Sequence, residues 1–241
     1  MTVILEAKRL TKSYGGVRVV DDLSVSLHER EALGVVGPNG AGKTTMLNLL
    51  TGIVHADEGT VVFYGADISR RTPDQRCLAG LGRTYQIPKP FEGMTVFENV
   101  LVGATYGRGR SEKDSYEICA RALHRAALLP QANVLAESLS LLERKRLELA
   151  RALATEPKVL LLDEIAGGLA EHEVHSLVDT IRQLRAEGIS IVWIEHIVRA
   201  LLAVVDRLVA IDFGRLIAEG DPHVVINSPE VRDVYMGSMA P

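Results

Sequence analysis

ALGVVGPNGAGKT, residues 32–44, is a short apolar run followed by a glycine-rich turn. The turn, residues 37–44, matches the pattern G-x-x-x-x-G-K-[ST] at every fixed position. The apolar run predicts a buried strand over Ala32–Gly37, and the residues after the turn predict a helix over Lys43–Leu50. A strand, a glycine-rich loop and a helix in this order are typical of a phosphate-binding loop.

Such a loop binds phosphate because its glycines let backbone N–H groups curve around the phosphate oxygens, and because the helix that follows adds a partial positive charge. We expect Lys43 to reach the β and γ phosphates of ATP and Thr44 to bind Mg²⁺. A glycine-rich turn without a ligand is the alternative. The expected ATP-binding residues of the loop are Gly37, Pro38, Asn39, Gly40, Ala41, Gly42, Lys43, Thr44 and Thr45.

A second buried strand ends in two acidic residues. The run KVLLLD, residues 158–163, ends at Asp163, and Glu164 follows it. Nucleotide-hydrolysing enzymes with a phosphate-binding loop need such a carboxylate for Mg²⁺, so we expect Asp163 to bind the metal. Glu164 is then placed to activate the water that attacks the γ phosphate. An acidic pair favoured only by the dipole of a following helix is the alternative.

Composition and charge limit the other function classes. The chain has 241 residues and a net charge of −4, so it has no overall basic field that would attract nucleic acid, and no nucleic-acid partner is expected. Cys77 and Cys119 form no metal-binding spacing and are expected to be reduced thiols. Glu6 interrupts the N-terminal apolar run, which argues against a signal peptide. Apolar runs such as Ala200–Val205 are too short to cross a membrane, so any membrane-spanning part must come from a partner.

Short β-branched runs alternate with helical patterns, which predicts an α/β fold with a mostly parallel sheet. Short strand signals in the first sixty residues add an antiparallel edge sheet. Strand signals fade between about residues 95 and 137, where we expect a helical subdomain with a solvated loop at Tyr106–Asp114. The prediction is one domain over residues 1–241, with residues 1–94 and 138–241 as the core around this insertion.

These motifs together resemble the nucleotide-binding subunit of an ATP-binding cassette (ABC) transporter, and the resemblance covers nearly the whole chain. It implies that Tyr14 stacks on adenine and that His196 contacts the γ phosphate. It also implies that Gln86 contacts Mg²⁺ and the attacking water and joins the core to the helical subdomain. Without the resemblance, Tyr14 is a half-buried strand residue and His196 a structural histidine at a strand end.

The stretch SLSLLERKRLELARALA, residues 138–154, departs from the family pattern. On its own it predicts an amphipathic helix in which Ser140 and Glu143 form a capping box. The resemblance implies that Ser140 binds the ATP of the opposite subunit, although Leu141 and Leu142 replace two glycines of the usual LSGGQ motif and Glu143 replaces its glutamine. We expect a helix start that still closes on ATP, with weaker affinity between the subunits.

A second departure concerns the loop after Glu164. Ile165 replaces the usual proline, and Ala170 stands where the family has an acidic residue or asparagine. The resemblance therefore puts in question the communication of this loop across the dimer, but not hydrolysis itself.

Within the family, residues 82–104, 144–153, 160–169 and 228–237 resemble the ATPases of branched-chain amino-acid importers. The resemblance implies integral-membrane permease subunits, a second ATPase subunit that is either another copy or a paralogue, and an extracytoplasmic solute-binding protein that acts indirectly. It also implies a peripheral location on the cytoplasmic face of the inner membrane. The alternatives are the ATPase of a urea or amide importer and a soluble ABC-type ATPase that acts on nucleic acid or in regulation.

Overall fold

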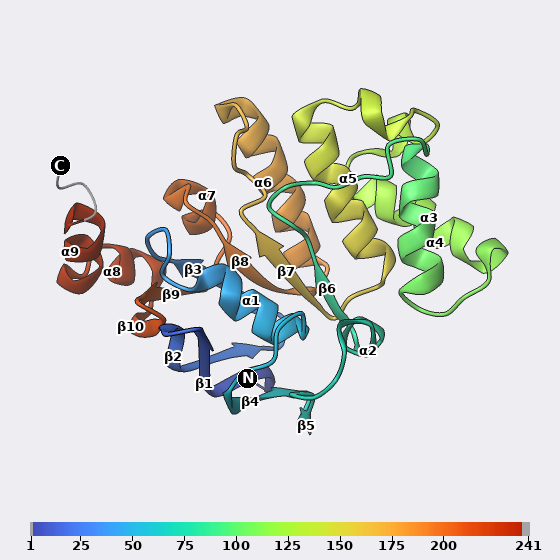
Figure 1. Ribbon diagram of the computed structural model, residues 1–241. Helices are drawn as coiled ribbons and strands as arrows, with labels where there is room; N and C mark the ends of the chain where they lie inside the picture. Colours follow the sequence, from blue (N-terminus) through green and yellow to red (C-terminus); the bar gives the residue numbers. More distant parts are fainter. Residues whose placement is uncertain (1, 238–241) are drawn as a thin grey trace. The chain divides into compact units, whose positions relative to one another are not determined.

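The computed structural model describes residues 2–237 and divides them into two compact units. The first unit combines the chain up to Arg76 with the chain from Ser190 onward, and the second is Cys77–Ile189. The outermost ends of the predicted domain, Met1 and residues 238–241, lie outside the described residues. Figure 1 shows the elements in chain order.

The first unit contains an antiparallel sheet with the strand order β2-β1-β4-β5. The expected antiparallel edge sheet is thus confirmed. Its long hairpin buries alternating apolar side chains, among them Leu10 and Leu23, as expected for a sheet that covers a core with one face. The strands are β1 (Val3–Tyr14), β2 (Val17–His28), β4 (Glu58–Phe63) and β5 (Ala66–Asp67).

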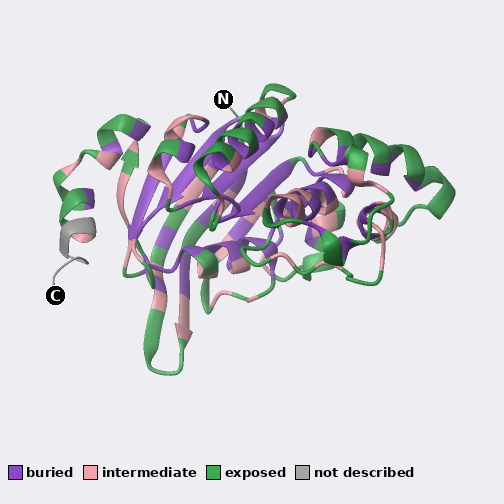
Figure 2. Ribbon diagram, turned by 90° about the horizontal axis from the view of Figure 1, so that it is seen from above, coloured by how far each residue is buried: buried purple, intermediate pink, exposed green. Residues whose placement is uncertain are grey.

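The same unit contains four more paired strands, in the order β10-β9-β3-β8. β3 is parallel to both of its neighbours, and β10 pairs antiparallel with β9. β3 and β8 are buried along their whole length, and for β3 this agrees with the apolar run that precedes the glycine-rich turn. Figure 2 shows buried strands in purple. The strands are β3 (Ala32–Val36), β8 (Ser190–Ile194), β9 (Arg207–Asp212) and β10 (Arg215–Gly220).

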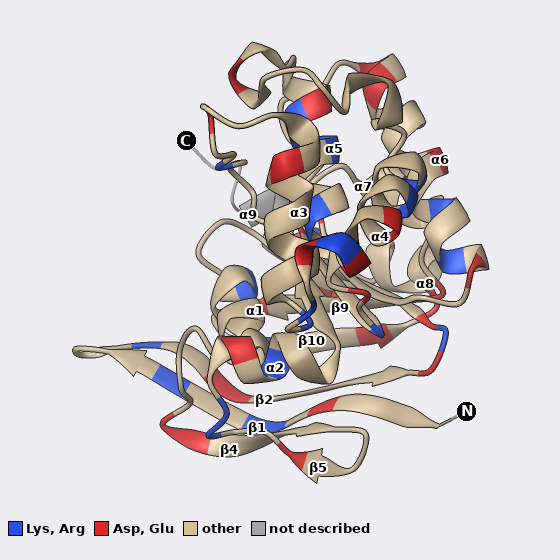
Figure 3. Cartoon of the chain, turned by 90° about the vertical axis from the view of Figure 1, so that its right-hand side faces the viewer, with Lys and Arg blue, Asp and Glu red and all other residues tan. Residues whose placement is uncertain are grey.

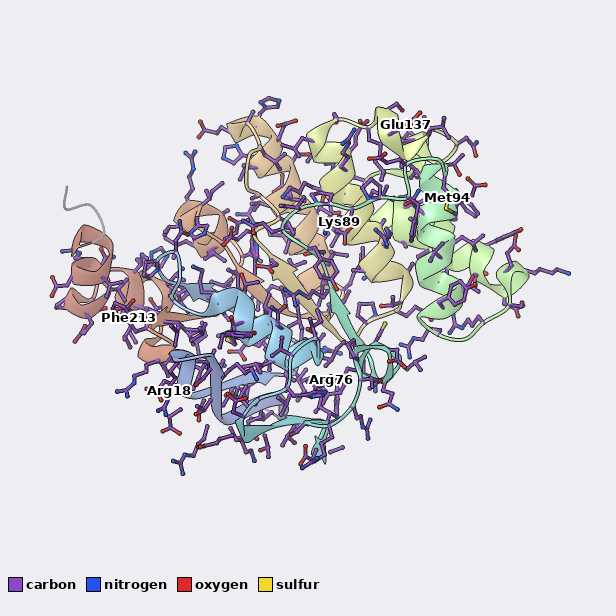
Figure 4. The ribbon with its side chains drawn as sticks, in the orientation of Figure 1. Arg18, Arg76, Lys89, Met94, Glu137 and Phe213 are labelled. Carbon is purple, nitrogen blue, oxygen red and sulfur yellow. The ribbon has the colours of Figure 1, made fainter. Side chains whose placement is uncertain are left out.

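Helix α1 (Lys43–Thr51) follows β3 and contacts β2 of the antiparallel sheet (Figure 1). It ends at Gly52, which has a left-handed conformation. The guanidinium of Arg76, labelled in Figure 4, donates to the carbonyl oxygens of Leu49 and Leu50 at 2.7 and 2.9 Å. Burial lowers the pKa of Arg76 to about 10. This buried cation adds hydrogen bonds to carbonyls of the last turn, where the regular helical pattern ends. The other helices of this unit are α7 (Val198–Leu202), α8 (Pro222–Ile226) and α9 (Pro229–Gly237).

The second unit contains the parallel pair β6 (Leu81–Arg83) and β7 (Val159–Asp163) and four long helices. Helices α3, α4 and α5 pack against one another (Figure 1). The predicted helical segment, residues 95–137, lies inside this unit. The helices are α3 (Val96–Tyr106), α4 (Glu112–Arg125), α5 (Leu141–Ala154) and α6 (Glu171–Ala186), and a short helix α2 (Pro73–Ala79) joins the two units along the chain.

The loop between α3 and α4 is shorter than predicted. Ser111 caps α4 by accepting a hydrogen bond from the N–H of Asp114, so the helix begins at Glu112 and includes the end of the expected loop, Tyr106–Asp114. Ser111 followed by Glu112 and Asp114 is a helix start signal. The prediction of a solvated loop over these residues did not take it into account.

Charge and thiol chemistry agree with the sequence analysis. Figure 3 shows basic and acidic positions interspersed along the strands of the antiparallel sheet. Cys77 and Cys119 are free thiols, and burial raises the pKa of Cys119 to about 11, which keeps it protonated and unreactive. Among residues 2–237, no helix combines the length and the apolar character needed to span a bilayer.

Candidate functional site

The predicted site residues fall in both units. Tyr14, residues 37–45 and His196 belong to the first unit, and Gln86, Ser140, Asp163 and Glu164 belong to the second.

The loop between β3 and α1 requires glycine at its two ends. Gly37 has φ +155°, and a Cβ atom there would overlap the carbonyl oxygen of Ile211 in β9. Gly42 has φ +100°, and a Cβ atom there would lie 2.5 Å from the carbonyl oxygen of Val19 in β2. Gly40, at φ +82°, would meet no atom within 4 Å. The glycines at both ends therefore let the loop pack against its own sheets, whereas Gly40 leaves open space on its Cβ side.

Lys43 points back along this loop. It is 5% exposed, and its Nζ donates to the carbonyl oxygens of Gly37 and Pro38 at 2.7 and 2.9 Å. Gly42 caps α1 without a side chain, so no side-chain oxygen covers the first N–H groups of the helix. A buried ammonium group and an uncovered helix N-terminus are what an anionic phosphate group needs. Thr44, one residue into the helix, is exposed.

Tyr14 and His196 complete the predicted residues of the first unit. Tyr14 ends β1 with 48% of its surface exposed, and the Nζ of Lys12 lies 5.7 Å from its ring centroid. This exposed ring can stack on a planar ligand. His196 is exposed two residues after the end of β8, and its backbone N–H donates to the buried carboxylate of Glu195 at 3.1 Å.

In the second unit, Asp163 ends β7 and is 2% exposed. Nη2 of Arg83, at the end of β6, donates to Oδ2 of Asp163 at 2.9 Å. The backbone N–H of Asp163 donates to Oγ1 of Thr84 at 3.3 Å. These contacts fix the carboxylate in the position where the sequence predicts a metal ligand.

Glu164 has a left-handed backbone, at φ +46°, which is uncommon for a residue with a side chain. Nε2 of Gln86 donates to its Oε2 at 2.5 Å. The structure therefore brings together two residues that were selected from positions 78 apart in the chain. Strained backbone of this kind concentrates at functional sites, where surrounding contacts maintain it.

The start of α5 forms the predicted capping box. The N–H of Ser140 donates to Oε2 of Glu143 at 2.9 Å, and the N–H of Glu143 donates to Oγ of Ser140 at 3.3 Å. Leu141, which replaces a glycine of the family motif, is 44% exposed. Its Cδ2 atom would lie 3.3 Å from a Cβ atom at Gly168.

Ala170 is the N-cap of α6 and offers no side-chain hydrogen bond, as its position in the sequence suggested. Instead, its N–H donates to Oε2 of Glu173 at 2.8 Å. The carboxylate of Glu173 thus accepts a hydrogen bond from the backbone at the start of its own helix.

Two residues of α5 differ from their sequence interpretation. An amphipathic helix normally carries its charged residues on the solvated face, but Lys145 and Glu148 are only 3% and 6% exposed. Nζ of Lys145 donates to the carbonyl oxygen of Gln86 at 2.6 Å and to that of Glu164 at 3.4 Å. The amphipathic rule failed because it sorts residues by polarity, whereas these two are buried in polar contacts.

Sequence reasoning also missed Arg83 as a partner of Asp163. Arg83 lies at the end of β6, which is parallel to β7. Because this pairing is known only from the fold, the sequence carried no signal that joins the two residues.

A family model described as "ABC transporter" matches residues 20–167, more than half of the chain. The chain belongs to the ABC transporter ATP-binding family. It is therefore an ATPase. The expected fold class, an α/β fold with a phosphate-binding loop, is confirmed. A second model, described as "Branched-chain amino acid ATP-binding cassette transporter", matches residues 215–241 of this ABC ATPase.

Curated relatives match the ABC ATPase over almost its full length. A probable branched-chain amino acid transport ATP-binding protein LivG of Archaeoglobus fulgidus is 33% identical over 98% of the chain and 96% of its own length. The lipopolysaccharide export system ATP-binding protein LptB of Haemophilus influenzae is 35% identical over 97% of both chains. A solved ATP-binding cassette of an ABC transporter, in its ADP conformation, is 31% identical, with a TM-score of 0.90 over 98% of this chain and 100% of its own.

The donor atoms of the ABC ATPase fit Mg²⁺, the metal that the family implies. Mg²⁺ prefers oxygen ligands, and the candidate ligands supply the hydroxyl of Thr44, the carboxylate of Asp163 and the amide oxygen of Gln86. The residues 2–237 contain no cluster of three or more histidine, cysteine or acidic side chains placed to hold a metal.

Proposed function

We propose that this ABC ATPase powers the import of a small polar solute, a branched-chain or related amino acid, through a separate integral-membrane permease. The match of residues 215–241 to the branched-chain amino acid model supports this substrate class, because the ATP-binding motifs are common to the whole family. The relatives named LivG point the same way. The subunit would work at the cytoplasmic face of the inner membrane.

The proposed residue roles follow from the chemistry of each group. Lys43, Thr44 and Asp163 bind ATP with Mg²⁺, and Tyr14 stacks on the adenine. Mg²⁺, when bound, neutralises phosphate charge. Glu164 activates the attacking water as a general base, and Gln86 and His196 orient it and the γ phosphate.

One observation carries the assignment of Glu164. Its carboxylate directly follows Asp163, and the side chain of Gln86 donates to it at 2.5 Å. A general base must be held in one orientation to accept a proton efficiently, and this hydrogen bond does so.

The substitution Glu164→Gln tests this role. We expect kcat for ATP hydrolysis to fall by about 10²- to 10⁴-fold, because the amide cannot accept a proton. The dissociation constant for ATP should stay unchanged. Glu137→Gln serves as the matched control, because it removes the same charge from an exposed residue, labelled in Figure 4. Nearly unchanged hydrolysis in Glu164→Gln would show that another residue is the base.

The partners are tested by isolating the tagged protein from detergent-solubilised membranes of its native host and identifying what accompanies it by mass spectrometry. We expect a polytopic permease pair and a second ATPase subunit, either another copy or a paralogue. The extracytoplasmic solute-binding protein should appear only through the permease. Its ligand can then be screened by thermal shift with branched-chain amino acids, other amino acids, urea and short amides.

The relatives named LptB support a second candidate, a subunit of an export system. The same isolation separates the two, because an importer permease is associated with a solute-binding protein and an exporter is not. Recovery of only soluble or nucleic-acid-bound partners would contradict both. Salt-sensitive DNA binding would then support the soluble alternative.

A further inference from the structure

Lys145 is a buried cation that contacts the backbone on both sides of the Gln86–Glu164 hydrogen bond. Its Nζ donates to the carbonyl oxygen of Gln86 at 2.6 Å and to that of Glu164 at 3.4 Å. Because Lys145 is only 3% exposed, its ammonium group has little freedom to leave these acceptors. The two residues whose side chains meet are thus also joined through their main chains by one ammonium group.

The contact to Glu164 lies on a strained part of the backbone. Glu164 has φ +46°, and a residue with a side chain keeps such a conformation only where neighbouring contacts hold it. The ammonium group of Lys145 donates to the peptide carbonyl of this residue, so it contributes to that restraint. A hydrogen bond from a charged donor is about twice as strong as one between neutral groups.

Two further residues of α5 hold the same segment, residues 86–91, one and two turns along the helix. The backbone N–H of Lys89 hydrogen-bonds the carboxylate of Glu148, and Nη1 of Arg151 donates to the carbonyl oxygen of Lys89 at 2.9 Å. The guanidinium of Arg151 lies 5.0 Å from the ring centroid of Phe91. Figure 4 shows Lys89 on this segment, beside α5. The segment that follows Gln86 is therefore anchored to α5, and Lys145 is the anchor nearest to Glu164.

We propose that Lys145 is a positioning residue for ATP hydrolysis, which holds Gln86 and the backbone of Glu164 so that their side chains keep the geometry required to activate water. The proposal rests on the proposed role of Glu164. Lys145 itself contacts neither ATP nor water in this role. It acts by fixing the two residues that do.

A double-mutant cycle on the full-length protein tests the proposal. Lys145→Met removes the donors while retaining an unbranched side chain, and it is made alone and together with Glu164→Gln. Single-turnover release of phosphate from radiolabelled ATP gives the hydrolysis rate, and filter binding gives the dissociation constant for ATP. Arg146→Met is the matched control, because Arg146 neighbours Lys145 on α5 but donates to Ala127 and Ser176.

We expect Lys145→Met to lower the hydrolysis rate by about 10²-fold, the cost of misplacing a catalytic group by about 1 Å. ATP affinity should change by less than about 2-fold. In the Glu164→Gln background, the same substitution should lower the remaining rate by less than about 2-fold, because the carboxylate whose position Lys145 and Gln86 maintain is already gone. Arg146→Met should leave the hydrolysis rate within about 2-fold of the unmodified protein.

Three results would overturn the proposal: an unchanged rate in Lys145→Met, an equal loss in both backgrounds, or an equal loss in Arg146→Met. Failure of the proposed function is distinguishable, because Glu164→Gln alone would then hydrolyse ATP at nearly the normal rate. If Lys145→Met does not fold, as judged by circular dichroism, Lys145→Gln keeps an N–H donor group and enters the same cycle.

Discussion

The carboxylate of Glu143 occupies the start of α5, where the ABC family usually has an uncharged glutamine. It accepts a hydrogen bond from the N–H of Ser140 at 2.9 Å and so satisfies a helix N–H group that could otherwise bind phosphate. A negative charge at this position stabilises the helix. In the proposed dimer, the same charge would repel the γ phosphate of the ATP bound by the opposite subunit. One residue thus favours α5 and opposes closure on ATP.

The substitution Glu143→Gln separates these two effects. The amide can still accept from the N–H of Ser140, whereas the charge is removed. In the Glu164→Gln background with ATP and Mg²⁺, we expect the dimer dissociation constant to fall by about 3- to 30-fold, because removing one charge at a helix terminus gains about 0.3–1 kcal/mol at each of the two ATP sites. Sedimentation equilibrium measures it.

Glu173→Gln is the control for this change, since Glu173 accepts from Ala170 in the same way at the start of α6. Tighter association in Glu173→Gln but not in Glu143→Gln would contradict the assignment of Ser140 to the opposite ATP.

At the scale of elements, a buried ion pair joins the turn before β3 to β9 in the first unit. Arg207 donates from Nε to Oε1 of Glu31 at 2.7 Å and from Nη2 to Oε2 at 3.0 Å. Burial by itself raises the pKa of Glu31. Hydrogen bonds from Arg207 and His28 lower the pKa by more than burial raises it, so that it lies below the ordinary 4.5. The folded state therefore favours the charged carboxylate.

This shift fixes the sign of a pH dependence. A carboxyl group whose pKa is lowered by folding contributes stability above its ordinary pKa and loses that contribution as pH falls through the lowered value. We expect Glu31→Gln to reduce the free energy of unfolding at pH 7 by about 1–2 kcal/mol, because it removes one of the two carboxylates that pair with the guanidinium of Arg207 while Glu219 remains. As the pH falls below 4.5, the difference from the unmodified protein should shrink. Urea unfolding at each pH measures it, and a difference that is constant with pH would contradict the ion-pair account.

The loop before α1 gives a second prediction at this scale. Gly42→Ala places a Cβ atom 2.5 Å from the carbonyl oxygen of Val19, on a backbone with φ +100°. We expect loss of ATP binding and a lower melting temperature, because the loop must move away from β2 to accept the methyl group. A Cβ atom at Gly40 would meet no atom within 4 Å, so Gly40→Ala should lower the melting temperature less than Gly42→Ala does. Calorimetry compares the two variants, and equal losses would show that backbone conformation, not the approach to β2, decides the effect.

At the scale of the whole molecule, the proposed mechanism uses two ATP molecules held between two ATPase subunits. Removing the general base should trap this state, since binding continues while hydrolysis stops. We expect Glu164→Gln to change from monomer to dimer on addition of ATP and Mg²⁺ in size-exclusion chromatography with light scattering. ATP with EDTA is the control and should leave the protein monomeric. A protein that stays monomeric with ATP and Mg²⁺ at high concentration, and also when assembled with its permease, would contradict a helix start at Ser140 that closes on ATP.

The sequence by itself determined the local chemistry of this ABC ATPase. Residues 37–44 specify their own loop, because glycines, a lysine and a following helix act over neighbouring positions. The strand that ends at Asp163 and the capping box of Ser140 and Glu143 are likewise read from short spacings, and the structure contains all three. Periodicity and helix caps depend on residues three or four positions apart, which any sequence displays directly.

Only the tertiary structure decided which distant residues hold these local features in place. The pairing of Arg83 with Asp163 depends on β6 lying parallel to β7, and the burial of Lys145 depends on two segments that are 59 and 19 positions away from it. Polarity alone would place Lys145 on the solvated face of α5, because a charged residue is usually exposed. The fold overrides that rule where main-chain carbonyl groups, brought together from different parts of the chain, satisfy a buried cation.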